Sequence, residues 1–316
     1  MTSDAAPGPN RRIGFLGPEG TFTEQALLSQ PDLAGETLVA MGTFAEILAA
    51  VDCGELDLGF VGIENSIEGT VNVTIDALAL EHDLLIQREV VLGIQLNVMA
   101  PAGVTLDRVE RVLTFPVAAG QCRAWLQEHL PGVEVVAANS NAEAARLVGA
   151  EADGRSAAVA PSLAAKIYDL EVLATDIEDH PENQTRFVLV GRDSIPAPTG
   201  HDKTSIVVFQ RADVAGSLLA ILQEFAARSI NLTKLESRPT KKQLGDYCFV
   251  IDLEGHLADE VVADCLRDLK LKTADIKLLG SYPAAGPQAP TARREAEAAW
   301  RQADAWLAEQ RSKLAR

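Results

Sequence analysis

One local pattern restricts the fold of this chain more than any other: a helix-capping box that recurs among strand-like runs. The box is Ser or Thr followed three residues later by Glu, and it occurs at Thr21–Glu24, Thr43–Glu46 and Ser140–Glu143. Strand-like runs such as Arg12–Leu16 and Leu58–Ile63 alternate with these helix starts. We therefore predict α/β units built on parallel sheets.

Two further segments indicate that this α/β region has two lobes. Residues 84–99 are long and rich in β-forming residues for a single element, which is typical of a segment that runs from one lobe into another. More strand–helix units are predicted in 111–160, and 183–191 has the pattern of a buried strand. We expect a ligand between the lobes, where small-molecule sites are common.

Beyond a linker at 194–202 that contains Pro and Gly, the order of elements changes. The patterns predict strand, helix, strand, strand, helix and strand, which is the βαββαβ order of a ferredoxin-like unit. The predicted ranges are 204–210, 214–228, 230–237, 247–253, 259–270 and 275–280. A second linker at 283–290 leads to a terminal helix from Thr291 with a partly apolar side.

The formal charge of the chain is 28 − 45 = −17, which repels nucleic acid and anionic membranes. An anionic ligand would therefore need local donors, such as helix N-termini or a well-placed arginine. No apolar run is long enough to span a membrane, and the start does not have the pattern of a signal peptide. The four cysteines form no CxxC pair, so we expect free thiols and a cytoplasmic protein.

No metal or cofactor site is indicated by the sequence. The five histidines are scattered, and neither a GxSxG nor an HExxH motif occurs. The turn Gly14–Thr21 lacks the GxGxxG spacing of a nucleotide loop. It is either a tight turn with a helix cap or an anion site formed by N–H groups and Thr21. Any chemistry would have to use hydroxyls, amides, carboxyls and arginine.

The loop Glu64–Val71 carries short polar side chains directly after an apolar strand. At the carboxyl end of a parallel strand, where ligands of α/β proteins usually bind, Asn65 and Ser66 could hydrogen-bond a carboxylate. Gly69 would let a ligand or the backbone approach closely. The alternative is a turn rich in Asx residues.

The stretch Asn183–Phe187 places a hydroxyl, a guanidinium and an aromatic ring in succession at the entrance of a strand. Arg186 either grips a carboxylate with its two-pronged guanidinium or is a paired structural arginine. In the C-terminal unit, Gly216 lies at a predicted loop-to-helix junction, where it would give an amino-acid ligand access to backbone donors. The alternative there is a glycine required only for packing.

These stretches together resemble the prephenate dehydratases, from about Arg12 to Tyr282. The matching segments occur in the order and spacing of that family: GPEGTFTEQA (17–26), IENSIEGTV (63–71), NQTRFVLVG (183–191), GSLL (216–219) and NLTKLESRP (231–239). The last two are similar to an ACT regulatory domain of the phenylalanine-sensing type. The family's N-terminal chorismate mutase fusion is absent, so we expect a monofunctional enzyme.

The resemblance implies an α/β fold with three parts. These are a two-lobed, periplasmic-binding-protein-like catalytic domain at 11–192, a ferredoxin-like ACT domain at 203–282 and a C-terminal helical tail at 291–316. The implied reaction is that of a hydro-lyase, which converts prephenate to phenylpyruvate, water and carbon dioxide without metal or cofactor. The alternatives are an arogenate dehydratase, with the same chemistry on the amino analogue, and a non-enzymatic amino-acid sensor.

The resemblance also implies roles for individual residues. Thr185 is expected at the leaving hydroxyl, with Asn65 and Ser66 as its catalytic partners. The expected substrate-binding residues are Thr21, Gly69, Ser140, Asn141, Arg186 and Phe187. The expected contacts of the inhibitor L-phenylalanine are Gly216, Ser217, Leu218, Asn231, Leu232, Glu236 and Ser237. Because ACT units usually pair around their ligand, we expect a homodimer or homotetramer.

Some positions depart from the family pattern. Gly62 stands where the family usually has Pro, and Leu96 stands where a His is common. Thr114–Pro116 replaces a Ser-His-Pro stretch, and Ser140–Asn141 replaces a Ser-Thr pair. We therefore expect the polarity of the cleft to differ from that of other members.

Overall fold

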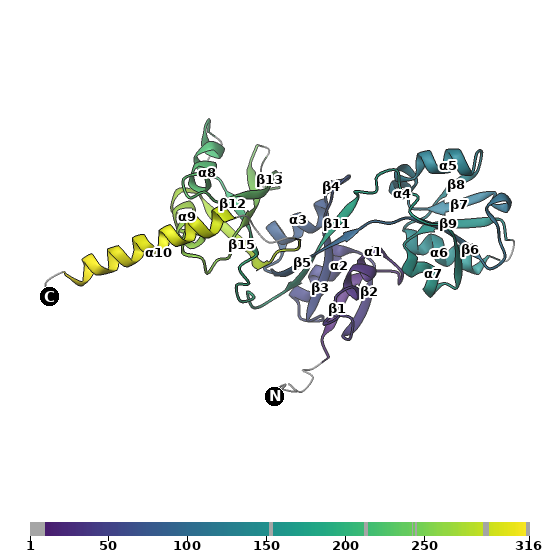
Figure 1. The fold of residues 1–316 in the computed structure, drawn as a ribbon, viewed down its shortest axis with the longest axis horizontal. Coiled ribbons are helices and arrows are strands. Elements are labelled where there is room, and N and C mark those ends of the chain that lie inside the picture. Colours follow the sequence, from purple (N-terminus) through teal and green to yellow (C-terminus); the bar gives the residue numbers. More distant parts are fainter. Residues whose placement is uncertain are drawn as a thin grey trace. The chain divides into compact units, whose positions relative to one another are not determined.

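The computed structural model describes residues 10–151, 154–211, 214–241, 243, 245–286 and 291–313. Figure 1 labels helices and strands of the fold. The contacts between residues divide the chain into two compact units. The first unit contains the residues up to Ile75 together with Val90–Val190, and the second contains Asp76–Glu89 and the residues from Gly191 onward. A central segment of the sequence, residues 76–89, therefore lies in the same unit as the C-terminal domain. Residues 287–290 of the predicted second linker and the last three residues of the predicted tail lie outside the described residues.

The first lobe of the first unit is a sheet with helices packed on it. Its elements are β1 (Arg12–Leu16), α1 (Phe22–Leu28), β2 (Thr37–Met41), α2 (Phe44–Asp52), β3 (Leu58–Asn65), the short β4 (Gly69–Thr70) and β11 (Gln184–Gly191). The strand order is β11-β3-β1-β2, and β4 pairs with β3. In the core of this lobe Phe60 stacks on Phe187, with ring centroids 5.5 Å apart.

The second lobe is a smaller sheet with its own helices. Its elements are β6 (Asn97–Pro101), η2 (Leu106–Arg108), β7 (Arg111–Thr114), α4 (Pro116–Gln121), α5 (Arg123–His129), β8 (Glu134–Ala137), α6 (Asn141–Ala150), β9 (Ser156–Ala160), α7 (Ser162–Ile167) and β10 (Leu170–Ala174). The strand order is β10-β6-β9-β7-β8. The predicted passage of residues 84–99 from one lobe to the other is confirmed. The segment forms two strands, β5 (Leu85–Gly93) in the larger sheet and β6 in the smaller one.

The prediction of parallel sheets is correct for only part of each sheet. β1 runs parallel to β2 and β3, and β7 runs parallel to β8 and β9. In contrast, β11 is antiparallel to β3, and β6 is antiparallel to β9 and β10. These strands carry the chain between the lobes and are not joined to their neighbours by a crossover helix, so a parallel arrangement is not imposed on them.

All three predicted capping boxes are present. The Thr21, Thr43 and Ser140 hydroxyls accept hydrogen bonds from the N–H groups of Glu24, Glu46 and Glu143 at 3.3, 3.1 and 3.0 Å. In each box the Glu carboxylate accepts from the residue before the cap, namely Gly20, Gly42 and Asn139. Each box thus satisfies two backbone donors where a loop enters a helix.

The second unit contains the predicted βαββαβ domain. Its elements are β12 (Asp202–Phe209), α8 (Ser217–Ala226), β13 (Leu232–Pro239), β14 (Tyr247–Glu254), α9 (Glu260–Lys272) and β15 (Asp275–Pro283), in the strand order β13-β14-β12-β15. Helix α8 begins three residues later than the predicted Val214. The reason is that its N-cap, Gly216, has a φ of +87°, which lies outside the helical conformation.

Two more parts of the second unit complete the description. The segment 76–89 continues α3 (Asn72–Asp76) into a π-helical turn, η1 (Ala77–Glu81), and then into β5. The terminal helix α10 (Thr291–Ser312) contacts α9 and exposes Trp306. The four cysteines are free thiols. No helix of the described residues has the length and hydropathy required to cross a bilayer.

Replacing the cap of α2 tests whether these hydroxyls stabilise the fold. We expect Thr43→Ala to destabilise the first unit by about 1 kcal/mol, because the N–H of Glu46 loses its acceptor. Thr43→Ser, which retains a hydroxyl, should stay close to wild type in the same urea titration. Equal stability of the Ala and Ser variants would show that the cap contributes nothing.

Candidate active site

A cavity of about 360 Å³ in the first unit is lined by residues of both lobes. Its walls are mostly apolar and include Phe22, Phe44, Leu96, Phe115 and Phe187. Its polar lining residues are Thr21, Thr23, Asn65, Gln121, Asn139, Ser140, Asn141 and Thr185. Among the described residues that line it, Glu68 is the only ionisable side chain. The cavity therefore offers neutral hydrogen-bonding groups on an apolar background.

Asn65 is the centre of the polar part of this cavity. It is the last residue of β3, and the antiparallel register places it opposite Thr185 on β11. Its Nδ2 donates to Thr185 Oγ1 at 2.9 Å and to Asn183 Oδ1 at 2.8 Å. Its Oδ1 accepts from the N–H groups of Ile67 and Glu68, both at 2.9 Å. One side chain thus fixes both the loop after β3 and the hydroxyl of Thr185.

The hydrogen bonds continue from Asn65 into the second lobe. Asn183 Nδ2 donates to Gln121 Oε1 of α4 at 3.2 Å, and Gln121 Nε2 donates to Glu68 Oε1 at 3.4 Å. Sequence reasoning assigned no role to Gln121 or Asn183. Asn183 could have been found, because it is the first residue of the 183–191 motif. Nothing near Gln121 in the sequence indicates partners more than fifty positions away.

Two helix starts border the cavity with their caps. The Thr21 hydroxyl donates to the Leu16 carbonyl at 2.8 Å while it caps α1. Ser140 caps α6, and Asn141 Oδ1 accepts from the N–H of Phe115 at 3.0 Å. The N-terminus of a helix carries partial positive charge, so these positions favour an anionic ligand in a chain of net charge −17.

Three of the predicted site residues are not among those that line the cavity. Ser66 joins β3 to β11, because its hydroxyl accepts from the Gln184 N–H at 2.9 Å. Gly69 is exposed, with a φ of +82°. Arg186 is buried on the face of β11 opposite Thr185 and Phe187, and its Nε lies 3.4 Å from Glu64 Oε2. This position favours a bracing role for Arg186, and the contact of all three with substrate stays a prediction.

The positions that depart from the family pattern gather in the cavity wall. Gly62, Leu96, Phe115, Ser140 and Asn141 all line it. A side chain at Gly62 would place its Cβ 3.3 Å from the Phe44 ring, so this glycine gives the ring its space. Leu96 is fully buried and adds an apolar surface.

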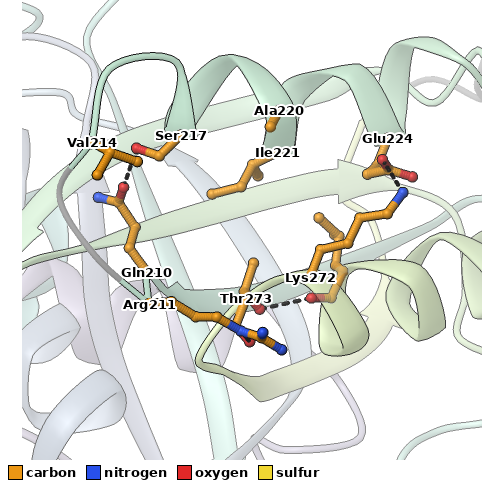
Figure 2. Close-up of a pocket in the computed structure, with 10 residues that line it drawn as sticks. Gln210, Arg211, Val214, Ser217, Ala220, Ile221, Glu224, Lys272 and Thr273 are labelled. Carbon is orange, nitrogen blue, oxygen red and sulfur yellow. Dashed lines mark hydrogen bonds and ion pairs between the residues drawn. The ribbon is translucent and has the colours of Figure 1, made fainter.

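The predicted effector residues lie in two places within the second unit. Gly216, Ser217 and Leu218 are at the start of α8, and Asn231 directly precedes β13, which contains Leu232, Glu236 and Ser237. A second cavity of about 190 Å³ between α8 and α9 is lined by Ser217 but by none of the other six (Figure 2).

The charged groups of this second cavity are engaged with their neighbours. Arg211 Nε donates to the Thr273 carbonyl at 2.9 Å, and Lys272 Nζ donates to Glu224 Oε1 at 2.6 Å (Figure 2). Ser217 donates to the side chain of Gln210.

Comparison with known proteins assigns the family. The family model described as prephenate dehydratase matches residues 13–195, and the ACT domain model matches residues 204–271. A prephenate dehydratase of Mycolicibacterium vanbaalenii is 45% identical over 286 residues, which are 86% of this chain and 90% of that protein. The chain belongs to the prephenate dehydratase family.

Solved structures agree with this assignment, but similar structures include a protein described with a different activity. A prephenate dehydratase of Arthrobacter aurescens in complex with L-Phe is 40% identical, with a TM-score of 0.87, and the match covers 95% of this chain and 99% of that one. GqqA, described as a novel type of quorum quenching acylase, is 31% identical, with a TM-score of 0.79 over 87% and 98% of the two chains. Activity must therefore be argued from the site and not from the fold.

The buried carboxylate of Glu24 provides a pH-dependent test of the first lobe. Burial raises the pKa of Glu24, the hydrogen bond from the Gly20 N–H opposes this, and the charge of Glu19 adds to the rise. Because the pKa is raised in the folded state, the ionised carboxylate lowers stability at neutral pH, and this penalty disappears as the pH falls through the folded pKa. We expect Glu24→Gln to raise Tm by about 2 °C at pH 7.5 and to match wild type near pH 4.

The matched control for this test is Glu46→Gln. Glu46 occupies the same position of its capping box but is exposed. It should gain no stability at either pH. A decrease in Tm for Glu24→Gln at pH 7.5 would contradict the assignment of a desolvation penalty to Glu24.

Proposed function

We propose that this chain catalyses the conversion of prephenate to phenylpyruvate, water and carbon dioxide, and that L-phenylalanine inhibits it through the ACT domain. Family membership supports the reaction class. The observation that carries the proposal is the Thr185 hydroxyl, which Asn65 holds in a largely apolar cavity lined by both lobes. The test is phenylpyruvate formation by the purified protein. L-Phenylalanine formed from arogenate, with no phenylpyruvate formed from prephenate, would indicate an arogenate dehydratase, and no turnover of either would indicate a sensor.

The reaction breaks two bonds and makes the ring aromatic. The C–O bond to the ring hydroxyl breaks as that oxygen takes a proton and leaves as water. The C–C bond to the ring carboxylate breaks as carbon dioxide leaves, and its electron pair enters the ring. The site must therefore deliver one proton and hold both leaving groups in position.

Thr185 is well placed to assist departure of the hydroxyl. Asn65 Nδ2 donates to Thr185 Oγ1, and no contact of Thr185 with the described residues uses the hydroxyl hydrogen. That hydrogen is then available to donate to the leaving oxygen, since a hydroxyl both donates and accepts. A threonine is a poor acid, so we assign Thr185 to orientation and relay of the proton.

The cavity wall suits the loss of carbon dioxide. The walls of the cavity include the apolar side chains of Leu96 and Phe115. An apolar environment disfavours a carboxylate relative to neutral carbon dioxide, so it promotes decarboxylation. The other substrate carboxylate is assigned to the cap of α6, where Ser140 and Asn141 offer a helix N-terminus.

The regulatory part of the proposal rests on the C-terminal domain. The Arthrobacter aurescens relative is described in complex with L-Phe, and by analogy we place the effector of this chain at Gly216–Leu218, Asn231–Leu232 and Glu236–Ser237. We further propose a cytoplasmic homodimer or homotetramer. The exposed side chains of Val214, Leu219 and Leu271 on this domain support self-association, which light scattering after size exclusion would measure.

Removing the Thr185 hydroxyl tests its role in the reaction. We expect Thr185→Ala to lower kcat by about 100-fold or more, the range of a lost proton-transfer group, while KM for prephenate changes by less than about 3-fold. Thr185→Ser retains the hydroxyl and should recover most of the rate. A kcat near wild type in the Ala variant would remove Thr185 from the mechanism.

Adding a methyl group at Gly216 tests the effector site. Its φ of +87° disfavours any L side chain, so we expect Gly216→Ala to distort the start of α8 and to raise the half-inhibitory L-phenylalanine concentration about 10-fold. Gly200→Ala is the matched control, because Gly200 has a φ of +84° and, like Gly216, open space around its Cβ position. Equal loss of inhibition in both variants would assign the effect to general strain.

A further inference from the structure

The segment 76–89, which lies within the sequence range of the catalytic family model, is held by basic side chains of the C-terminal domain. Asp76 accepts hydrogen bonds from Arg238 Nε at 3.1 Å and Nη2 at 2.5 Å, and from Lys241 Nζ at 2.9 Å. The side chains of Asp76 and Arg238 are only 16% and 15% exposed. Burial raises the pKa of Asp76, but the hydrogen bonds from Lys241 and Arg238 outweigh this effect and hold the carboxyl ionised.

Further contacts tie the rest of this segment to the same domain. Lys277 Nζ donates to the His82 carbonyl at 2.6 Å, and Lys203 Nζ lies 2.9 Å from the fully buried carboxylate of Glu89. Ile86 pairs with Gly280 so closely that a Cβ on this glycine would clash with the Ile86 carbonyl oxygen. The segment is therefore fixed to the C-terminal domain at both ends and in the middle.

Both ends of this segment continue directly into the wall of the candidate active site. Val71 lines the cavity 76 − 71 = 5 residues before Asp76, and Ile94 lines it 94 − 89 = 5 residues after Glu89. In α3, the fully buried Thr74 donates to the carbonyl of Gly62, another lining residue, at 2.7 Å. One helical turn thus connects Asp76 to two positions of the cavity wall.

Arg238 lies on β13, the strand that carries several of the predicted effector residues. On β13 the side chains of Lys234, Glu236 and Arg238 share one face of the sheet, while Ser237 points to the other and is exposed. Glu236 lies 3.4 Å from Arg238 Nη1 and 3.5 Å from Lys234 Nζ. A change of β13 on effector binding would therefore act on Arg238 directly.

We propose that Arg238 is a positioning residue, which through its ion pair with Asp76 fixes α3 and with it the cavity wall at Gly62 and Val71. The same ion pair transmits the effector state of β13 to the reaction. This inference rests on the proposed function and specifies the physical link between its two halves. Neither residue lines the cavity, so we assign their effect to the position of α3.

Kinetics of four variants test the link. We expect Asp76→Asn and Arg238→Gln to raise KM for prephenate. We define the inhibition ratio as kcat/KM without L-phenylalanine divided by kcat/KM with saturating L-phenylalanine. In both variants this ratio should fall to within about 2-fold of unity. In wild type this ratio should fall in the 5- to 150-fold range that is typical of allosteric coupling. Asp76→Glu, which keeps the charge, should recover part of the ratio.

The control, Arg228→Gln, breaks a comparably buried cluster with Glu224, Asp264 and Asp268 that has no bond to the segment 76–89. It should lower Tm and keep the ratio. The proposal would be overturned if this control lowered the ratio as much as Arg238→Gln does. It would also be overturned if the folded Asp76→Asn and Arg238→Gln variants kept the wild-type ratio.

Hydrogen exchange provides a readout that needs no turnover. In wild type, L-phenylalanine should change the exchange of amides in residues 71–76. In Asp76→Asn these amides should not respond, although calorimetry still detects L-phenylalanine binding within about 3-fold of the wild-type affinity. If prephenate is not a substrate, the proposed function fails while this response still tests the link. If the wild-type amides do not respond, the link itself is disproved.

Discussion

The bridge from Asn65 to Thr185 and Asn183 is the interaction on which the candidate site depends. It joins residues that are 118 and 120 positions apart in the sequence. The bridge forms because β11 runs antiparallel to β3, which places the start of one strand beside the end of the other. In a parallel pair the start of β11 would lie beside the start of β3, about 20 Å from Asn65. The direction of a single strand therefore assembles the site.

The composition of the cavity explains how an acidic chain can bind a ligand with two carboxylates. Among the described residues the lining contains neither Lys nor Arg, and Arg186, the cation nearest in sequence to Thr185, faces the other side of β11 and is paired with Glu64. Binding must then rely on amides, hydroxyls and helix N-termini, whose dipoles act strongly because the surrounding walls are apolar. Such fixed neutral donors can stabilise a charge that moves during the reaction. Unlike a cationic side chain, they are not neutralised by an ion pair with the bound substrate.

Local features of the fold were predictable from the sequence, because capping boxes and glycine stops act over three or four residues. Thr43 caps α2, and Gly54, just past the end of that helix, has the positive φ typical of such a stop. The antiparallel direction of β11 was not predictable, since an apolar run reads the same in both directions. Gln121 was missed for a similar reason: its partners come from the other lobe. The sequence left two roles open for Arg186, and the alternation of side chains along the folded strand favours the bracing role.

The boundary of the C-terminal domain in space differs from its boundary in the sequence, and this difference limits how such proteins can be recombined. A sensor domain exchanged at the linker 194–202 would leave residues 76–89 behind with the wrong partner. Glu89 would then lose both Lys203 and the N–H of Ala285, and a buried carboxylate without these partners is strongly destabilising. Substitutions in residues 76–89 and in the C-terminal domain must therefore stay compatible with each other. The ACT domain of this chain is for this reason not an interchangeable module.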